Sequence, residues 1–200
     1  MSGFDDETRF IERLRARDER AFNELVKQYE RRIFGLLLRM IGRRDEAEDL
    51  AQEVFVQVFK AIGTFRGEAK LSTWIFRIAM NLSKNRTKYL ARRRTDSQDH
   101  FAGPGEEVPI HRARNSNMGI IDRPDELLSG VELEAIVERS IAELEPEFRE
   151  VLILRDVEEM SYEEIAEITG LADGTVKSRI HRARLQLKQA VELALGEKIG

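Results

Sequence analysis

Two long segments of the chain repeat apolar residues at spacings of three and four, and a stretch without this periodicity separates them. Such spacings place side chains on one face of an α-helix, whereas a half-buried strand alternates at every second residue. The intervening stretch, residues 96–130, holds three of the four prolines, four glycines and several Ser, Asn and Asp residues, which is typical of a linker. The pattern predicts an all-α protein in which two small helical domains, residues 1–95 and 131–200, are joined by a flexible linker.

Local signals divide the two segments into eight predicted helices. Gly42 and Gly63 fall where helices are expected to end, because a left-handed residue often closes a helix. In the first segment the predicted helices cover residues 6–17, 19–42, 45–62 and 72–93. In the second segment they cover residues 131–144, 147–157, 161–169 and 174–195. The first two helices are expected to supply core residues: Phe10, Leu14, Phe22, Leu25, Val26, Tyr29, Ile33, Leu37 and Met40.

The composition excludes several classes of protein. No apolar run approaches the roughly 18 to 20 residues that a membrane-spanning helix requires, and the first residues lack the pattern of a signal peptide. The absence of cysteine excludes disulfides, thiolate nucleophiles and cysteine-bound metal sites. With 42% hydrophobic and 35% charged residues, the chain is expected to be a soluble cytoplasmic protein.

The formal net charge of -4 hides an uneven distribution. Residues 1–95 carry 21 basic and 14 acidic residues, which gives +7. Residues 96–130 carry 3 basic and 7 acidic residues, and residues 131–200 carry 9 and 16. Within that last, acidic segment, however, residues 177–188 hold five basic residues and no acidic one. Basic zones are the electrostatic footprint of a nucleic-acid-binding surface, so two candidate zones remain.

The predicted helix over 45–62 has an apolar face and an acidic face. At 100° per residue its apolar stripe contains Ala47, Leu50, Ala51, Val54, Val58 and Ile62. On the other side Glu46, Asp49 and Glu53 form an acidic ridge, with Gln52 beside it. The ridge is either a solvated helix face or a surface that meets a basic partner, which would relieve the repulsion between like charges. A metal site is less favoured because no histidine lies nearby.

The segment over residues 65–89 combines cations, amides and aromatic rings. Four residues fall almost on one line of the predicted helix, with Asn85 to the side: Arg77, Asn81, Lys84 and Lys88. A cation can neutralise a phosphate, and an Asn offers a donor and an acceptor to a base edge. The preceding loop holds Phe65, Arg66 and Lys70, with Trp74 close behind, and stacking on aromatic rings suits single-stranded nucleic acid. The alternative is that Trp74 and Phe76 belong to the core and the cations are simply solvated.

The same helix is expected to be capped by Ser72 or Thr73 and to bury one stripe. That stripe consists of Ile75, Ile78, Ala79 and Leu82.

Residues 161–184 have the spacing of a helix-turn-helix. Ser161 and Glu164 form a capping box, and Gly170 is placed to end the first helix. On the second helix the expected buried line is Val176, Ile180, Ala183 and Leu187. The candidates for reading a major groove are Lys177, Ser178, His181 and Arg182, with Thr175 near a phosphate and Arg179 and Arg184 at the flanks. A helix-turn-helix that binds only protein is the alternative.

Motifs of catalysis are missing from the sequence. The three histidines lie far apart, and no zinc-protease, serine-hydrolase or nucleotide-binding signature occurs. We therefore expect no enzyme activity, no cofactor, no metal and no small-molecule substrate. A metal-dependent nuclease that uses carboxylates is left open by the motifs alone.

Taken together, three stretches resemble the extracytoplasmic function (ECF, group 4) sigma factors of bacterial RNA polymerase, particularly the sigma-E-like members. These stretches are DEAEDLAQEVF (45–55), FRGEAKLSTWIFRIAMNLSKN (65–85) and LRDVEEMSYEEIAEITGLADGTVKSRIHRAR (154–184). The resemblance covers nearly the whole chain in order and spacing. Two departures concern turns: Leu144, Glu145 and Pro146 stand where the family often has Leu-Pro, and Glu159 stands where Gly is frequent.

The resemblance implies a sigma region 2 domain over 1–95 and a sigma region 4 domain over 131–200. The first would bind core polymerase at the clamp helices of the largest subunit through Glu46, Asp49, Gln52 and Glu53. It would also bind the melted minus-ten element through Phe65, Arg66, Lys70, Trp74, Arg77, Asn81, Lys84, Asn85 and Lys88, with a flipped base held by Asn81 and the loop. The second would meet the polymerase flap and read the minus-thirty-five duplex through Thr175, Lys177, Ser178, Arg179, His181 and Arg182.

Family members are commonly held inactive by an anti-sigma factor, often membrane-bound, so the resemblance also implies such a partner at the membrane face. A helix-turn-helix regulator that is not a polymerase subunit is the alternative, but it leaves the acidic ridge and the loop over 65–70 without a role.

Overall fold

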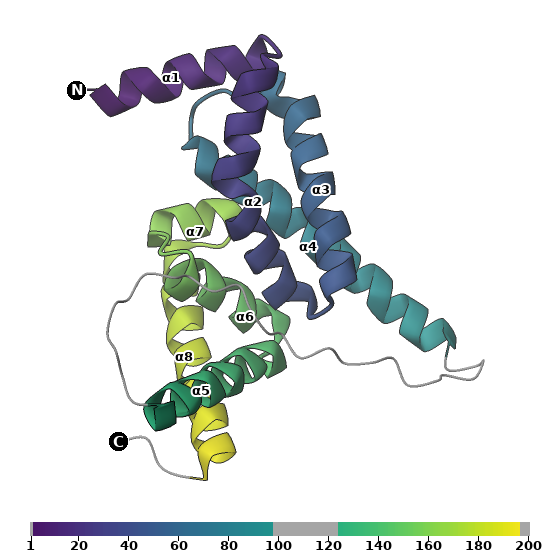
Figure 1. Ribbon diagram of the computed structural model, residues 1–200, viewed down its shortest axis with the longest axis vertical. Coiled ribbons are helices and arrows are strands. Elements are labelled where there is room, and N and C mark those ends of the chain that lie inside the picture. Colours follow the sequence, from purple (N-terminus) through teal and green to yellow (C-terminus); the bar gives the residue numbers. More distant parts are fainter. Residues whose placement is uncertain (1, 98–123, 197–200) are drawn as a thin grey trace. The chain divides into compact units, whose positions relative to one another are not determined.

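The computed structural model describes residues 2–97 and 124–196, and these residues form two compact units built from helices (Figure 1). No strand occurs in the described ranges, as the sequence predicts. None of the described helices is long and apolar enough to cross a membrane. The predicted linker falls mostly on residues 98–123, which lie outside the described residues.

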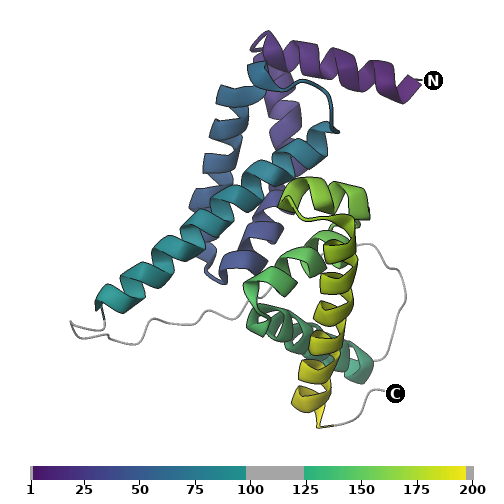
Figure 2. The same cartoon turned by 180° about the vertical axis from the view of Figure 1, so that it is seen from behind.

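The N-terminal unit contains four helices and one short turn of 3-10 helix. They are α1 (Ser2–Arg15), α2 (Glu19–Ile41), α3 (Arg44–Ala61), the 3-10 turn (Ile62–Thr64) and α4 (Leu71–Ser97). Helices α2, α3 and α4 pack against one another, and α1 packs against α2. The largest fully buried side chains of this core are Leu14, Leu25, Ile33, Leu36, Leu37, Leu50, Ile62, Ile75, Phe76 and Met80. The C-terminal part of α4 projects beyond the ends of α2 and α3 (Figures 1 and 2).

Side chains and glycines fix the ends of α2. Asp18 caps its N-terminus, since its carboxylate accepts hydrogen bonds from the backbone N–H groups of Arg20 at 2.8 Å and Ala21 at 3.3 Å. The Arg13 guanidinium, 2.8 Å from that carboxylate, lowers the pKa of Asp18. Gly42 closes the helix with a left-handed φ of 76°, as predicted. Gly63 does not adopt a left-handed φ; the left-handed residue of that region is Gly67, with φ 77°.

The C-terminal unit is also helical. Its helices are α5 (Pro124–Glu143), α6 (Pro146–Leu152) with a π-helical turn over Ile153–Val157, α7 (Tyr162–Thr169) and α8 (Asp173–Leu195). Helix α8 packs against both α5 and α6. The buried apolar residues are Ile141, Leu144, Phe148, Val151, Leu152, Ile153, Leu154, Met160, Ile165, Ile168, Val176, Ile180, Ala183 and Val191.

Two helices extend into the stretch that the sequence assigns to the linker. Helix α4 runs to Ser97, and α5 begins at Pro124, seven residues before the predicted start at residue 131. Proline is tolerated in the first turn of a helix, where its missing N–H has no intrahelical partner, and the acidic residues that follow suit a helix N-terminus. The proline was therefore a start signal rather than a linker signal. The division of function between the two domains stays a prediction.

Candidate nucleic-acid interface

The helix-turn-helix forms at the predicted residues. The Glu164 carboxylate accepts from the backbone N–H of Ser161 at 2.8 Å, and the Ser161 hydroxyl accepts from the N–H of Glu164 at 3.2 Å. This reciprocal pair is the predicted capping box at the start of α7. Gly170 ends the helix with φ 73°. Both ends of α7 are thus fixed by residues inside or next to it.

Helix α8 turns the predicted residues outward. Lys177, Ser178, His181 and Arg182 are all exposed. The opposite face buries Val176, Ile180 and Ala183, as predicted, while Leu187 is only half-buried. At the start of α8, Thr175 is partly buried, and its N–H donates to the carbonyl of Ala172 at 2.8 Å. The four exposed side chains form one surface of the stretch that contains no acid.

Two arginines of α8 are held by carboxylates of neighbouring elements. Arg179 lies 2.8 Å from Glu147 of α6, and its side chain is 27% exposed. Arg184 donates two hydrogen bonds to Asp156, at 3.0 Å and 2.5 Å, and this carboxylate raises the pKa of Arg184. Sequence reasoning placed both arginines at the flanks of the surface but missed the acids, because 28 or more residues separate the members of each pair.

Tyr162 is a second feature that the sequence did not single out. The Lys177 ammonium lies 5.7 Å from the centre of its ring, and the Arg155 guanidinium lies 5.0 Å from it. Cations within about 6 Å of an aromatic face are attracted by the ring. This aromatic residue at the start of α7 therefore steadies one of the four exposed side chains of α8.

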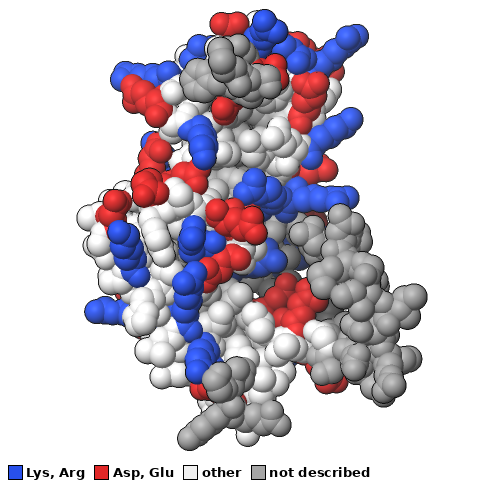
Figure 3. All heavy atoms as spheres, turned by 90° about the vertical axis from the view of Figure 1, so that its left-hand side faces the viewer, with Lys and Arg blue, Asp and Glu red and all other residues white. Residues whose placement is uncertain are grey.

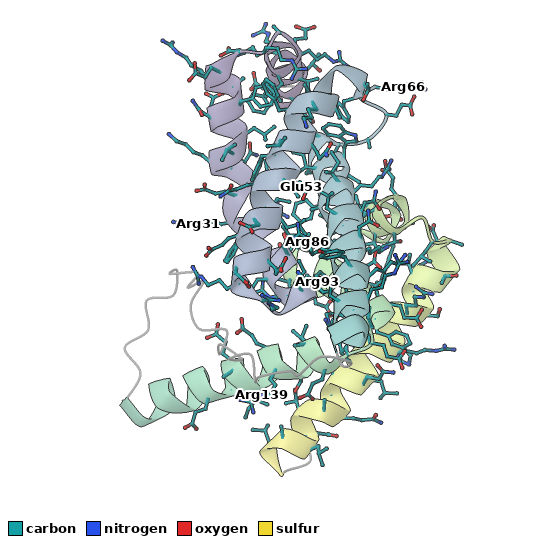
Figure 4. All side chains as sticks on the ribbon, turned by 90° about the vertical axis from the view of Figure 1, so that its right-hand side faces the viewer. Arg31, Glu53, Arg66, Arg86, Arg93 and Arg139 are labelled. Atoms are coloured by element: carbon teal, nitrogen blue, oxygen red, sulfur yellow. The ribbon has the colours of Figure 1, made fainter. Side chains whose placement is uncertain are left out.

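In the loop over residues 65–70 the cations are exposed and the aromatic ring is buried. Phe65 is 4% exposed and packs on Trp74 with ring centres 5.1 Å apart, so its ring is covered in this structure, and its contact with DNA stays a prediction. Arg66, at 81% exposure, points away from the unit (Figure 4) and lies 3.8 Å from Glu68. Lys70 is also exposed, and Trp74 is half-buried.

The start and the buried face of α4 differ from the prediction. The helix begins at Leu71, so Ser72 and Thr73 lie within the first turn rather than at the cap. Phe76 is fully buried, which is the alternative that the sequence left open for this ring. The buried residues of α4 are Leu71, Thr73, Ile75, Phe76, Ala79, Met80 and Ser83, whereas Ile78 and Leu82 are half-buried. The stripe is wider than predicted because α4 packs against both α2 and α3.

Helix α4 carries most of its predicted polar line on the surface. Asn81, Asn85 and Lys88 are exposed, while Arg77 and Lys84 are partly buried. The basic character continues along the projecting end of the helix with Arg92 and Arg93, both exposed. Along this face of α4, from its N-terminal to its C-terminal end, exposed amide side chains are therefore followed by cations.

Two residues of the acidic ridge of α3 contact α4, and the others are exposed. Arg86 of α4 contacts Glu46 and lies 3.5 Å from Glu53 (Figure 4), and the Glu46 side chain is only 17% exposed. The basic partner of these two acids is thus in part this chain itself, a contact that helical periodicity cannot reveal. Asp49 and Gln52 remain exposed.

Two apolar side chains extend the exposed part of α3. Val56 is 48% exposed and Phe59 is 45% exposed, although both are large and hydrophobic. They follow Asp49 and Gln52 at helical spacings of three and four, so the four residues share one face. We call this face the α3 line. The apolar half of this face was not predicted, because only Glu46, Asp49, Gln52 and Glu53 were expected to bind a partner.

The surface charge is mixed rather than uniform. Figure 3 shows one side of the molecule, on which basic and acidic side chains are interspersed. Among the described residues, no group of three or more histidine, aspartate or glutamate side chains is placed to hold a metal ion.

Comparisons with known proteins identify both units. The family model described as Sigma-70 region 2 matches residues 25–96, and the model described as Sigma-70, region 4 matches residues 134–187. The structure of a sigma factor in complex with the anti-sigma factor NepR from Bartonella quintana matches with a TM-score of 0.67 and 25% identity, over 86% of this chain and 96% of that chain. CnrH, solved with the cytosolic domain of CnrY, shares the fold with a TM-score of 0.64 and 20% identity.

Curated relatives match along nearly the full length. The RNA polymerase sigma-H factor of Pseudomonas aeruginosa is 37% identical over 96% of this chain and 97% of its own length. The ECF RNA polymerase sigma-E factor of Haemophilus influenzae is 36% identical over 91% of this chain and 93% of its own length. The chain therefore belongs to the extracytoplasmic function family of RNA polymerase sigma factors, the alternative sigma factors that direct transcription, and its relatives include sigma-E members.

Proposed function

We propose that this sigma factor is a cytoplasmic specificity subunit without catalytic activity of its own. It binds core RNA polymerase, grips the minus-thirty-five element as duplex DNA with α8, and captures the minus-ten element as a single strand with α4. The observation that carries the proposal is the exposed surface of α8: four side chains that can reach base edges or phosphates, in a stretch without an acid.

Reading of the duplex rests on the chemistry of that surface. Arg182 can form a bidentate pair with guanine, and His181 can donate to or accept from base edges. The Ser178 hydroxyl donates to the carbonyl of Thr175 at 3.0 Å and can accept from a base edge. Lys177, steadied by Tyr162, and Thr175 at the helix start suit phosphates. Arg179 and Arg184 are engaged by Glu147 and Asp156, so their proposed contribution is to fix the surface and to approach phosphates only where the ion pairs open.

Capture of the minus-ten strand rests on α4 and the loop before it. Asn81 and Asn85 offer amide groups to an extruded base, and Arg66, Lys70 and Lys88 offer cations to the strand. The Phe65 ring is covered in this structure and supports Trp74, so a base contact by Phe65 stays a prediction. A surface that binds only extruded bases favours the melted state by its differential affinity, which removes the need for ATP.

Binding to polymerase rests on the α3 line. Asp49 and Gln52 are polar and exposed, Val56 adds an exposed apolar side chain, and Phe59 is an aromatic residue of a kind enriched at interfaces. We assign this line to the clamp helices of the largest polymerase subunit. The C-terminal unit is assigned to the polymerase flap.

An anti-sigma factor is the proposed regulator. The structural relative from Bartonella quintana was solved in complex with one. By that likeness, an anti-sigma factor would occupy the polymerase-binding surfaces of this chain, and a membrane-bound one would hold the chain at the membrane face.

The test is transcription in vitro with purified core polymerase. Core enzyme plus this protein should start transcripts at a specific site in a library of promoter-length DNA, where neither component does so alone. A helix-turn-helix regulator would bind a site but start nothing without another sigma factor, and a nuclease would cleave the library in the presence of divalent metal. Neither alternative accounts for a match to both sigma regions.

The polymerase-binding assignment has its own matched pair of variants. Asp49→Lys should lower the affinity for core polymerase at least tenfold without changing the melting temperature, because Asp49 is exposed. Glu48→Lys reverses the same charge one residue away, at an exposed site that faces Arg44 at 2.8 Å. It should bind core polymerase like the wild type. Equal affinities for both variants would refute the α3 line.

A further inference from the structure

The loop between the 3-10 turn and α4 is anchored at both ends and open in the middle. Phe65 at its start and Leu71 at its end are 4% and 2% exposed. Between them, the side chains of Arg66 and Glu68 are 81% and 78% exposed. The two ends of the loop are therefore buried and its middle is exposed, and the loop holds the cations assigned to the minus-ten strand.

Helix α1 contacts both ends of this loop. The Arg15 guanidinium, at the end of α1, donates to the backbone carbonyl of Phe65. The Glu7 carboxylate, two turns earlier on the same helix, accepts from the backbone N–H of Leu71 at 3.2 Å. The two contacts join residues 50 and 64 positions apart in sequence. Helix α1 thus spans the loop from its first residue to the first residue of α4.

Each contact satisfies a backbone group that has no partner within the secondary structure. The first N–H groups of a helix lack intrahelical acceptors, and a negative charge at this end is favoured by the helix dipole. Glu7 therefore acts as a cap supplied by another helix, which explains why neither Ser72 nor Thr73 is needed as the cap of α4. Arg15 does the same for a loop carbonyl with a charged donor, which makes the stronger kind of hydrogen bond.

We propose that α1 is a brace for the strand-binding loop, and that Glu7 and Arg15 are positioning residues for capture of the minus-ten strand. Neither residue touches DNA in this proposal. They hold the two ends of the loop so that Arg66, Lys70 and the start of α4 keep one arrangement while the strand is bound. The inference rests on the proposed function of the loop, but the brace itself is a property of the free protein.

The attachment of α1 to the rest of the unit does not depend on these two residues. Leu14 is fully buried, and Arg13 pairs with Asp18 at 2.8 Å and with Glu24 at 3.1 Å. Removing the Arg15 guanidinium should therefore loosen the loop without detaching the helix. This separates a positioning role from a general role in stability.

The fluorescence of Trp74 reports on the start of the loop in the free protein. Trp74 is the only tryptophan of the chain, and its ring packs on Phe65. Arg15→Met should raise the acrylamide quenching constant of Trp74 about twofold, and Arg15→Lys, which keeps a charged donor, should restore most of the wild-type value. Arg9→Met removes the same charge from an exposed site on α1 and should leave quenching unchanged. Equal quenching in Arg15→Met and the wild type would overturn the brace.

Hydrogen exchange tests the second contact of α1, between Glu7 and the backbone N–H of Leu71. Glu7→Leu removes the acceptor of the Leu71 N–H, so exchange of that amide should accelerate about tenfold, whereas Glu7→Gln, which keeps an acceptor, should accelerate it less. The amides of α2 should exchange as in the wild type. Unchanged protection of Leu71 in Glu7→Leu would overturn the assignment of Glu7.

The functional arm uses the reconstituted holoenzyme. The probe is a single-stranded oligonucleotide carrying the non-template minus-ten sequence of a promoter selected from random DNA by wild-type holoenzyme. Arg15→Met holoenzyme should bind this strand about tenfold more weakly, with unchanged affinity for core polymerase and rescue by Arg15→Lys. Failure of wild-type holoenzyme to bind any strand would refute the proposed function of the loop. Normal strand binding by Arg15→Met would instead refute the brace alone.

Discussion

At the scale of single residues, the two arginines Arg182 and Arg184 differ in how they are engaged. Both are exposed and lie two positions apart on α8, but only Arg184 is fixed by a carboxylate, that of Asp156. An arginine that reads a base must be able to reach the groove, whereas one held in an ion pair has already formed charge-assisted hydrogen bonds. We therefore expect Arg182 to contact bases and Arg184 to hold the surface of α8 in place.

Arg182→Ala should relax the base preference at one position of the minus-thirty-five element by about 1 to 3 kcal/mol if the arginine forms a bidentate pair with guanine. Arg184→Ala should leave that preference unchanged. Selection of binding sites by variant holoenzymes, followed by sequencing, measures both. A uniform loss of affinity across all sequences for Arg182→Ala would make this residue a phosphate contact instead.

Glu159 stands in a backbone conformation that disfavours it. Its φ of 56° lies in the left-handed region, where a side chain beyond glycine costs roughly 1 to 2 kcal/mol. The side chain is exposed, so its removal loses no packing. A glycine at this position would adopt the same φ without that cost.

We expect Glu159→Gly to stabilise the C-terminal unit by about 0.5 to 1 kcal/mol, because relief of the left-handed strain exceeds the added entropy of the unfolded chain. Glu159→Ala keeps the Cβ and should give no such gain. Chemical denaturation of the full chain measures the difference. A glycine variant less stable than the wild type would mean that the Glu159 side chain makes a favourable interaction.

At the scale of elements, Arg86 is the ionic connection between α3 and α4. It joins the helix assigned to polymerase with the helix assigned to DNA, through Glu46 and Glu53. Because Glu46 is mostly removed from water, loss of the guanidinium leaves a partly buried carboxylate without this partner. The pair therefore matters more for stability than the exposed ion pairs of the surface.

Arg86→Met should destabilise the N-terminal unit by about 1 to 3 kcal/mol. Adding Glu46→Gln removes a carboxylate charge that Arg43 alone then faces, at 3.7 Å, and should recover part of that loss. The double-mutant cycle is measured by urea unfolding, since contacting residues give non-additive changes. Strict additivity of the two changes would show that the ion pair contributes nothing.

Elements whose signals are local were predicted well, and elements fixed by distant contacts were not. All four ends of α7 and α8 were predicted within one residue. For α7 the signals are local, because Ser161, Glu164 and Gly170 lie within or beside the helix whose ends they fix. The ends of the loop over residues 65–70 were misread, because α1 contacts the Phe65 carbonyl and the Leu71 N–H from 50 and 64 residues earlier. No periodicity within one helix contains that information.

At the scale of the whole molecule, the net charge of -4 constrains how the chain meets DNA. Binding to DNA is driven largely by neutralisation of phosphates, and the long-range field of an acidic protein opposes a polyanion. The N-terminal segment and residues 177–188 are basic, but each is surrounded by a chain whose total charge is negative. These two basic segments can therefore orient the protein on DNA, but they contribute little to the affinity of the whole chain for DNA.

The isolated chain should consequently bind its own promoter no more tightly than about 10⁻⁶ M at physiological salt, the range of non-specific binding. Core polymerase should tighten binding at least a hundredfold, because it supplies the missing affinity and holds the DNA while the strand melts. A mobility shift titrated with salt, with and without core enzyme, measures both values. Glu132→Lys with Glu134→Lys, at exposed positions of α5 outside the proposed DNA-binding surfaces, should strengthen binding of the isolated chain to any DNA sequence alike. Nanomolar, sequence-specific binding by the isolated wild type would show that local contacts outweigh the field of the whole molecule.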